Sequence, residues 1–378
     1  MLLLFVAWLL SGLAIAGTAY AALAALLVWR PRPGACVAED NLPSVSLLKP
    51  LAGSHPGLED DLRSFCEQQY PGQLQIIFGV QSRSDAAIAV ARRLAQEYPS
   101  RRIELVVDPL ANGANPKVAN LRNMLPWANG DVIIVSDSDI RVGTDYVVTL
   151  VGELAPTPNG AVTCLYAGRA EGGLWSQIAA MNIDLQFLPN ALLAARLNLA
   201  EACFGATIAL RRETLDAIGG FAPLSPYLAD DFELGRAVCA RGGRVRLSSL
   251  IVQHSSSAAG LEDLFRHELR WARTVRVLNP LGYAGTFVTH ALPLAILAAV
   301  AGGFSPFGLL VVAAALAGRV CLAWRIHGLI GARVDRVWLL PLRDVLAFVI
   351  FLVSFLGNSV YWQGTRYRTT AHGVMAQQ

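Results

Sequence analysis

The sequence predicts an α/β domain with a mostly parallel sheet, joined to membrane-spanning helices. Two observations predict this fold. Apolar strand-like stretches alternate with helix-like stretches between residues 40 and 280, which is typical of a parallel sheet covered on both faces. Three long runs without charged residues also occur, at residues 2–29, 277–318 and 345–365. A spanning helix needs about 20 apolar residues, so these runs indicate a membrane protein.

The uncharged runs predict four membrane spans. The middle run is long enough for two spans and divides at the sequence GGFSPFG, and the first run lacks the basic start of a cleaved signal peptide. We therefore expect an uncleaved anchor followed later by three further segments, at residues 3–29, 284–303, 306–324 and 338–362. The corresponding division of the chain is an N-terminal anchor (1–30), a soluble domain (40–280), C-terminal membrane helices (281–365) and a tail (366–378).

Arginines predict the orientation of the chain. Arg30 and Arg32 follow the first span, and three more arginines separate the third and fourth spans. Basic loops favour the cytoplasmic side, so the soluble domain should face the cytosol, with the N-terminus outside. Arg366 and Arg368 would then lie outside, unless one of the late segments is re-entrant.

The soluble domain begins with a regular series of elements. Its apolar stretches and helical periodicities predict strands at 44–50, 74–80, 102–108 and 131–137, and helices at 57–71, 85–99 and 116–128. No G-x-G-x-x-G follows the first strand, and no P-loop motif occurs. A phosphate-binding sheet without a glycine-rich loop needs another positive charge, for which a divalent cation held by acids is the usual source.

Composition excludes two other classes of protein. The net charge of +3 is too small to indicate nucleic-acid binding. The six cysteines, at 36, 66, 164, 203, 239 and 321, show no C-x-x-C spacing and no metal pattern. We expect them to be small buried side chains in a reducing compartment.

Asp137 and Asp139 follow the strand at 131–137, in the sequence SDSDIRV. Ligands bind beyond the carboxyl ends of the strands in such sheets. A turn at the strand end would let both acids face one cleft, where carboxylates and substrate phosphates hold Mg²⁺ or Mn²⁺. The alternative is an ordinary solvated turn, in which aspartate is common.

Two further motifs carry candidate site residues. Asp230 and Asp231, in YLADDFELGRAV, precede a helical stretch: one could be its N-cap, or one could be a general base whose pKa the other raises. Arg270 and Trp271, in RHELRWARTVR, could close over a diphosphate. The alternative for this basic helix is a membrane anchor that attracts anionic lipid heads.

The segment 173–197 is strongly apolar, with charges only at Asp184 and Arg196. A helix this apolar has to bury its surface, and an interfacial position would suit it. We expect it to contact the membrane or a lipid acceptor. An ordinary core helix is the alternative.

Six short sequences occur in an order that resembles the ceramide glucosyltransferase-like family of membrane glycosyltransferases. The resemblance covers residues 40–280 and rests on VSLLKPLAG (45–53), NPKVANL (115–121), SDSDIRV (136–142), FGATIALRRETLDAIGGF (204–221), ADDFELGRA (229–237) and RW (270–271). The bacterial hopanoid-associated branch is the more similar one, because SDSDIRV keeps a full D-x-D and HELRWARTVR suits that branch.

The resemblance implies a GT-A fold, a UDP-sugar donor, a divalent cation and inverting transfer to a lipid hydroxyl. The lipid would be a hopanoid polyol or ceramide, the sugar glucose or N-acetylglucosamine, and the location a bacterial inner membrane. The implied roles are metal and nucleotide contact for Asp137 and Asp139, the general base for Asp231 beside Asp230, and the diphosphate side for Arg270 and Trp271. Donor contacts are implied for Lys49, Pro50, Lys117 and Asn120.

The sequence departs from the family pattern at two places. Relatives carry an acid soon after the second strand, where this chain has Ser82, with Asp85 three residues later, so a donor contact is expected from one of them. Three residues before the Arg–Trp pair, relatives have Gln or Arg, and this chain has His267, which can donate a hydrogen bond without a full charge at neutral pH.

Two other functions use the same observations. A processive polysaccharide synthase shares the catalytic motifs, but usually has more membrane spans to form a channel. A non-catalytic membrane scaffold with a decayed domain is the other alternative.

Overall fold

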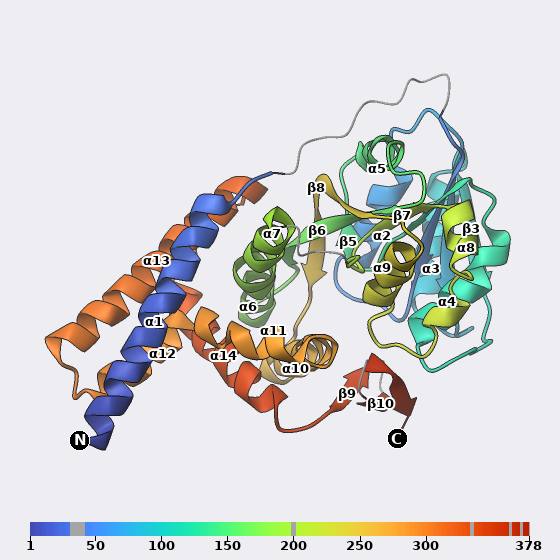
Figure 1. Ribbon diagram of the computed structural model, residues 1–378. Coiled ribbons are helices and arrows are strands. Elements are labelled where there is room, and N and C mark those ends of the chain that lie inside the picture. The colour runs from blue at the N-terminus through green and yellow to red at the C-terminus, as the bar shows by residue number, and fades with distance from the viewer. Residues whose placement is uncertain (31–41, 198–201, 333–335, 363–364, 371–372, 378) are drawn as a thin grey trace.

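The computed structural model describes residues 1–30, 42–197, 202–332, 336–362, 365–370 and 373–377. An α/β domain lies beside a bundle of apolar helices, and a layer formed by α6 and α7 lies between them (Figure 1). The C-terminal strands lie next to the α/β domain and not at the far side of the bundle.

The first half of the α/β domain confirms the predicted order of elements. Strands β1 to β4 pair in parallel in the order β3-β2-β1-β4. They span Val45–Pro50 (β1), Leu74–Val80 (β2), Arg102–Val107 (β3) and Val132–Val135 (β4). The helices between them are α2 (Leu58–Cys66), α3 (Ala87–Glu97) and α4 (Pro116–Met124).

The central strands are buried on both faces, as continuous apolar runs predict. Leu47 packs with residues of α2, α3 and α5 (Tyr146–Leu154), whereas the next residue, Leu48, packs with residues of α4 on the other face. Successive side chains of a strand point to opposite faces, so the run from Val45 to Pro50 supplies both cores at once.

The second half of the sheet is mixed. Strand β7 (Ile208–Arg211) pairs antiparallel with β4 and with β6 (Ala161–Ala170). Strand β6 pairs in parallel with β8 (Val245–Ser256), and the two-residue strand β5 (Ile140–Arg141) pairs antiparallel with β8. Helices α8 (Arg212–Ala217) and α9 (Asp230–Ala240) complete this half. The eight-stranded sheet is thus mostly parallel. Its two antiparallel strands are β7, between β4 and β6, and β5, beside β8.

The apolar segment at 173–197 forms an internal layer of the protein. It consists of α6 (Leu174–Asn182), a π-helical turn η3 (Ile183–Phe187) and α7 (Leu188–Arg196). Ile178, Leu185 and Leu188 are buried in a cluster with residues of α1 (Leu2–Leu27) and α13 (Pro306–Ile330). These side chains therefore behave as the core-helix alternative predicts, and contact with lipid stays a prediction for the rest of the segment.

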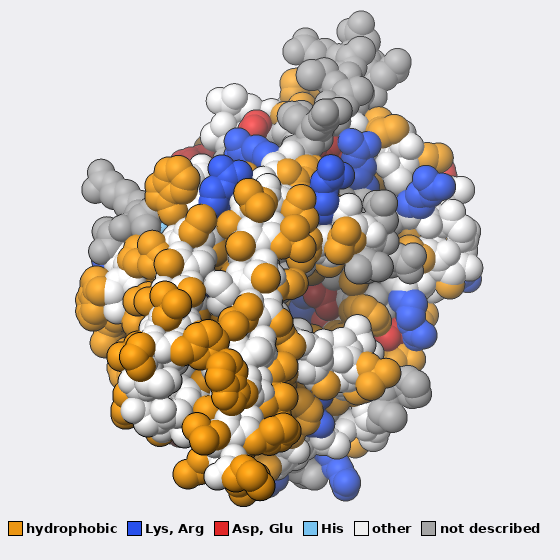
Figure 2. Space-filling model, turned by 60° about the vertical axis from the view of Figure 1, so that its left-hand side comes forward, with side chains coloured by type: hydrophobic (Ala, Val, Ile, Leu, Met, Phe, Trp, Pro, Cys, Tyr) orange, Lys and Arg blue, Asp and Glu red, His pale blue; other side chains and the backbone are white. Residues whose placement is uncertain are grey.

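Helix α1 packs on α12 (Ala291–Ala301) and α13 through small residues. A Cβ atom on Gly17 would lie 2.1 Å from the carbonyl oxygen of Val288, so only glycine permits this approach. Small residues allow membrane helices to pack closely in this way. The outward face of the bundle is covered by apolar side chains over α1 and α13, with arginine side chains at one edge (Figure 2).

The predicted span at 284–303 is wrong as one continuous helix. Residues Pro280–Thr289 and Ala291–Ala301 form a pair of helices bent by 60°. Helix α12, with its 11 residues, is only about 16 Å long, roughly half of the 30 Å hydrocarbon core. In the described residues four other helices, Leu2–Leu27, Leu174–Arg196, Pro306–Ile330 and Val337–Ser354, are long and apolar enough to cross a membrane.

The predicted span at 338–362 is also too long. Helix α14 (Leu340–Ser354) ends before residue 355, and a three-stranded sheet follows, formed by β9 (Ser359–Trp362), β10 (Thr365–Thr369) and β11 (Met375–Gln377). This sheet pairs with the α/β domain through a bridge between Tyr227 and Val374. Arg366 and Arg368 therefore lie on the same side as that domain, which removes the conflict in the predicted orientation.

Buried ion pairs join α14 to its neighbours. Arg319 of α13 makes two hydrogen bonds of 2.8 Å to Asp344. Arg343 makes two of 2.6 Å to Glu268 of α10 (Leu261–Leu278). Removing one partner of such a pair leaves an unpaired buried charge, so the register of α10 against α14 is strongly fixed. This matters because α10 carries His267, Arg270 and Trp271.

Candidate active site

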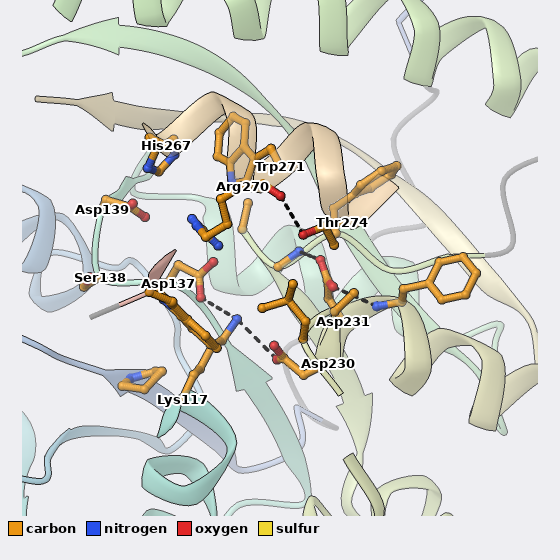
Figure 3. Close-up of a pocket in the computed structure, with 18 of the residues that line it drawn as sticks. Lys117, Asp137, Ser138, Asp139, Asp230, Asp231, His267, Arg270, Trp271 and Thr274 are labelled. Atoms are coloured by element: carbon orange, nitrogen blue, oxygen red, sulfur yellow. Dashed lines mark hydrogen bonds and ion pairs between the residues drawn. The ribbon is translucent and has the colours of Figure 1, made fainter. Parts of the chain in front are cut away.

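A pocket of about 690 Å³ opens at the carboxyl ends of β1 and β4. The four acids that the sequence singled out line it together with Lys117, His267, Arg270 and Trp271. Figure 3 shows Asp137, Asp139 and Arg270 on one side of this space and Asp230 and Asp231 on the other. The pocket therefore brings together residues from β4, α4, α9 and α10.

The two acids after β4 face the same pocket because the chain turns between them. Strand β4 ends at Val135, and β5 begins at Ile140 in antiparallel pairing with β8, where Ile140 lies opposite His254. The backbone of β8 also holds the turn, since Ser255 N donates to the carbonyl oxygen of Asp139 at 2.7 Å. This geometry confirms the turn that the sequence predicted.

Each acid of this pair has its own basic partner. Lys117 Nζ lies 2.6 Å from Asp137 Oδ1, and His254 Nε2 lies 3.3 Å from Asp139 Oδ2. Burial would raise the pKa of Asp139, but His254, His55 and Lys49 together lower it. Burial raises the pKa of Asp137, and the adjacent Lys117 opposes this shift by stabilising the charged carboxylate.

Lys117 links the two sides of the pocket. Its ammonium group also lies 3.4 Å from Asp230 Oδ2. Burial would lower the pKa of Lys117, but Asp137, Asp230 and Asp231 raise it above its ordinary value. Helix α4 starts at Pro116, directly before Lys117, because Asn115 is its N-cap and accepts a hydrogen bond from Val118 N. A permanently charged ammonium group at this position suits a phosphate ligand.

Asp231 is held by backbone groups. Its Oδ2 accepts a hydrogen bond from Gly205 N at 2.8 Å, and its Oδ1 accepts one from Phe232 N at 2.8 Å. The N-cap of α9 is Ala229 and not either acid, so the capping alternative is wrong for both. Burial, followed by the charge of Asp230, raises the pKa of Asp231 to about 6. A carboxylate with such a pKa can accept a proton near neutral pH.

Gly205 lies between the acids of the two sides. A Cβ atom here would lie 3.1 Å from Asp137 Oδ2 and 3.2 Å from Asp231 Oδ2. The sequence marked this residue only as part of the family stretch FGATIAL. The structure adds a reason for glycine, because a side chain would crowd both carboxylates.

Helix α10 forms the wall beside Asp139. The Trp271 ring contacts the imidazoles of His267 and His254, with ring centroids 4.5 and 5.8 Å apart. Trp271 thus packs on two histidines, while the Arg270 side chain points toward Asp137 and Asp139 (Figure 3). His267 is exposed at the edge of the pocket, and the loss of surrounding water, followed by the nearby Arg270, lowers the pKa of its imidazole.

Three of the residues predicted to contact the donor do not line the pocket. Lys49 is fully buried and donates hydrogen bonds to the carbonyl oxygen of Asp137 and to Ser136 Oγ, so it supports the acid from behind. Asp85 accepts hydrogen bonds from Gly53 N and Ala87 N. Neither Asp85 nor Ser82 lines the pocket; from this segment Gln81 does.

Pro50 and Asn120, which were also predicted to contact the donor, line the pocket, as Lys117 does. The Asn120 amide donates to the carbonyl oxygens of Gly79 and Leu51 at 2.8 and 3.4 Å. It joins β1, β2 and α4 at the edge of the pocket, where a nucleotide would lie in a sheet of this type.

Several residues of the pocket were missed in the sequence. His254 and Tyr166 come from β8 and β6, and Tyr361 and Trp362 come from the C-terminal sheet. A single histidine within a strand, such as His254, forms no motif. Tyr361 and Trp362 lie inside an uncharged run that was interpreted as a membrane span. Only the pairing of the strands places them in the pocket.

Asp139 and His254 could hold a divalent cation. Asp139 Oδ1 is buried and has no hydrogen-bond partner among the described residues, and Oδ2 faces the imidazole nitrogen. The part of the chain that the structure describes has no cluster of three or more His, Cys, Asp or Glu side chains able to hold a metal. Mg²⁺ and Mn²⁺ are commonly bound by one or two protein ligands completed by substrate phosphates and water, so the residues present fit such an ion.

The fold and the pocket define a GT-A glycosyltransferase. A mannosyltransferase from Pyrobaculum calidifontis, solved in complex with GDP-mannose and Mn²⁺, has the same fold: the match has a TM-score of 0.54 at 20% identity and covers 92% of this chain and 99% of that one. The family model for glycosyl transferase family 21 matches residues 9–375. The chain belongs to this family.

Similar curated proteins act on lipids according to their names. Ceramide glucosyltransferase 3 of Caenorhabditis elegans is 27% identical over 243 residues, which are 62% of this chain and 51% of that protein. Beta-monoglucosyldiacylglycerol synthase of Trichormus variabilis is 26% identical over 209 residues, 54% of this chain and 43% of that protein. The chain thus spans about half the length of the curated relatives it matches.

A raised pKa of Asp231 predicts a pH-dependent rate of transfer. The family resemblance implies that Asp231 is the general base, which must be unprotonated to act, so the rate should rise as the pH passes about 6 and level off above pH 7. One unit below the midpoint, at pH 5, about a tenth of the maximal rate should remain. Turnover at saturating substrate between pH 5 and 8 measures this profile. Asp230→Asn removes a neighbouring negative charge and should move the midpoint to lower pH; an unmoved midpoint would contradict the assignment.

Proposed function

We propose that this protein is a membrane-bound inverting glycosyltransferase that transfers a hexose from a UDP-sugar to the hydroxyl group of a membrane lipid. The observation that carries the proposal is the position of Asp231. It lies across the pocket from Asp137, Asp139 and Arg270, and it is the acid whose pKa is raised to about 6. This arrangement separates a proton acceptor from a phosphate-binding side.

The residues on the phosphate-binding side would stabilise the leaving diphosphate. Lys117 and Arg270 are permanently charged and open to the pocket. A divalent cation, when held by Asp139 and His254, would neutralise the charge that builds up on the diphosphate. Pro50, Gln81 and Asn120 border the adjoining part of the pocket, which suits the nucleoside.

Transfer would then follow a single displacement. Asp231 takes the proton of the lipid hydroxyl, and the hydroxyl oxygen forms a bond to the anomeric carbon. The bond from that carbon to the phosphate oxygen breaks, and its electron pair leaves with UDP. Attack from the side opposite to the leaving group inverts the anomeric carbon, so no covalent intermediate with the protein is required.

The exposed apolar surface of the helix bundle agrees with a membrane lipid as the acceptor. The bundle of α1, α12 and α13 carries an exposed apolar surface that includes Leu9, Leu309 and Leu310. Arg325 Nε donates to the carbonyl oxygen of Ala25, so the basic end of α13 lies beside the end of α1. We place this end, and the catalytic domain, at the cytosolic face of a bacterial inner membrane.

The test is transfer by the purified full-length protein in lipid discs. UDP-glucose and UDP-N-acetylglucosamine are each offered with Mg²⁺ or Mn²⁺ and with ceramide, diacylglycerol or a hopanoid polyol. Mass spectrometry of the lipids should find one added sugar, a hexose from UDP-glucose or an N-acetylhexosamine from UDP-N-acetylglucosamine, with one UDP released per product. Long saccharide chains would indicate a processive synthase instead, and no consumption of either donor with any lipid would contradict the proposal.

The natural acceptor is best found in cells. Lipid profiles of a strain with and without the gene should differ in one class of glycolipid. The proton and carbon NMR spectra of that lipid give the anomeric configuration of the transferred sugar, which should be opposite to that in the donor.

A further inference from the structure

The C-terminal sheet of β9, β10 and β11 contributes to the active-site pocket. Tyr361 and Trp362, at the end of β9, line the pocket together with Arg270. The Arg270 guanidinium lies over the Trp362 ring, 5.8 Å from its centroid. An arginine within about 6 Å of an indole face is attracted to it.

Arg270 has little else to hold it. Within the described parts of the chain its side chain makes no hydrogen bond and no ion pair, although it points toward Asp137 and Asp139. A long side chain of this kind has several rotamers. Among the described residues, the indole adds a direct side-chain contact to the attraction of Asp137 and Asp139, and so helps to hold Arg270 in the pocket before any diphosphate is bound.

The C-terminal sheet that carries Trp362 is held from two sides. On the α10 side, Arg273 donates to the carbonyl oxygen of Ser359, and Arg276 Nη2 donates to the carbonyl oxygen of Gly357 at 2.8 Å. On the other side, Met375 N donates to Pro226 O at 2.7 Å, and Leu228 N donates to Gly373 O at 2.9 Å.

The second set of bonds reaches the catalytic acids. Residues 226–228 lie just before Asp230 and Asp231 in the chain. Leu228 is buried in a small cluster with Val360, Tyr367 and Met375. The sheet thus spans from the helix that carries Arg270 to the segment that carries the base.

We propose that Trp362 is a positioning residue that holds Arg270 over the donor diphosphate, which makes the C-terminal sheet a part of the active site. The inference rests on the proposed function for the role of Arg270. It assigns a role in turnover to residues beyond the last membrane helix, which the sequence marked only as the end of a span and a tail.

A double-mutant cycle tests the inference in the full-length protein. Trp362→Ala and Arg270→Ala are made singly and together, and transfer is measured alongside UDP binding in the presence of Mn²⁺. Trp362→Ala should lower kcat/KM about tenfold, the size expected for a partly desolvated contact of this kind. Because Trp362 acts through Arg270, the double variant should be no worse than Arg270→Ala alone.

Conservative variants separate stacking from packing. Trp362→Phe keeps an aromatic face and should retain most of the rate, whereas Trp362→Leu keeps apolar bulk without that face and should resemble Trp362→Ala. Arg368→Ala, an exposed position on β10 of the same sheet, should leave transfer unchanged. Thermal unfolding checks that each variant is folded.

Two results would overturn the inference. One is a wild-type rate and UDP affinity for Trp362→Leu. The other is a double variant whose loss equals the product of the two single losses. A wild-type protein that binds UDP but transfers no sugar would contradict the proposed function alone, since the cycle can still be read from UDP binding.

Discussion

Replacing Asp231 by asparagine should abolish sugar transfer, with a loss of about 10² to 10⁴ in turnover, the usual contribution of a positioned general base. The carboxylate accepts hydrogen bonds from Gly205 N and Phe232 N, so it is fixed in place. Among the described residues no ion pair joins it to a basic side chain. Asparagine keeps the shape but cannot take the proton from an acceptor hydroxyl.

The same variant should retain donor binding. The phosphate-binding residues Lys117, Asp139 and Arg270 are unchanged, so UDP affinity should stay within a few-fold of the wild type. The asparagine amide can accept only one of the two backbone hydrogen bonds. The unmade bond should cost about 1–3 kcal/mol in the free energy of unfolding, which thermal unfolding would detect as a modest shift.

Asp230→Asn is the matched control for this prediction. Asp230 is the preceding residue, and it pairs with Lys117 and accepts a hydrogen bond from the Asn115 amide. Its loss should lower turnover less than the loss of Asp231. Asp231 is not the base if Asp231→Asn retains more than about a tenth of the turnover, or if Asp230→Asn loses more turnover than Asp231→Asn.

Replacing Asp139 by alanine should lower turnover at least about a hundredfold, because it removes a ligand of the cation that offsets the diphosphate charge. The variant should also lose most of its response to added Mn²⁺. The residue sits on a turn fixed by β8 and its Oδ1 has no hydrogen-bond partner in the described structure, so folding should be little affected.

The cation prediction has two independent checks. His254→Ala should weaken Mn²⁺ activation in the same direction, since the imidazole faces Asp139. Asp263→Ala, an acid exposed at the rim of the same pocket, should leave Mn²⁺ activation unchanged. Full turnover in EDTA would refute the role of Asp139 as a metal ligand.

Local patterns in the sequence were sufficient for the first half of the fold. The run VSLLKP, for example, forms β1 within one residue of its predicted bounds, because a strand buried on both faces must be apolar throughout. The acid pair Asp137 and Asp139 could be found for a similar reason: it stands where such a run stops, at the edge where ligands bind.

Other features depended on contacts between distant parts of the chain. Lys49 lies in the motif VSLLKPLAG and was expected to contact the donor, yet it is buried behind Asp137. Which side chains at the end of a strand face the pocket depends on how the neighbouring helices and strands pack against it. The bend at His290, next to the place where Gly17 approaches Val288, was missed because apolar periodicity does not indicate where a helix bends.

The sequence by itself determined the class of fold, the order of its first elements and the two pairs of acids, since apolar periodicity and turn chemistry act over a few neighbouring residues. Only the tertiary structure decided that His254 meets Asp139 and that Trp362 meets Arg270. The contact of His254 with Asp139 comes from the pairing of β5 with β8. The contact of Trp362 with Arg270 comes from strand β9, which lies in the uncharged run 345–365, and the apolar composition of this run suits a membrane helix equally well. Pairing between distant strands is fixed by the packing of the whole domain, and it leaves no local signal.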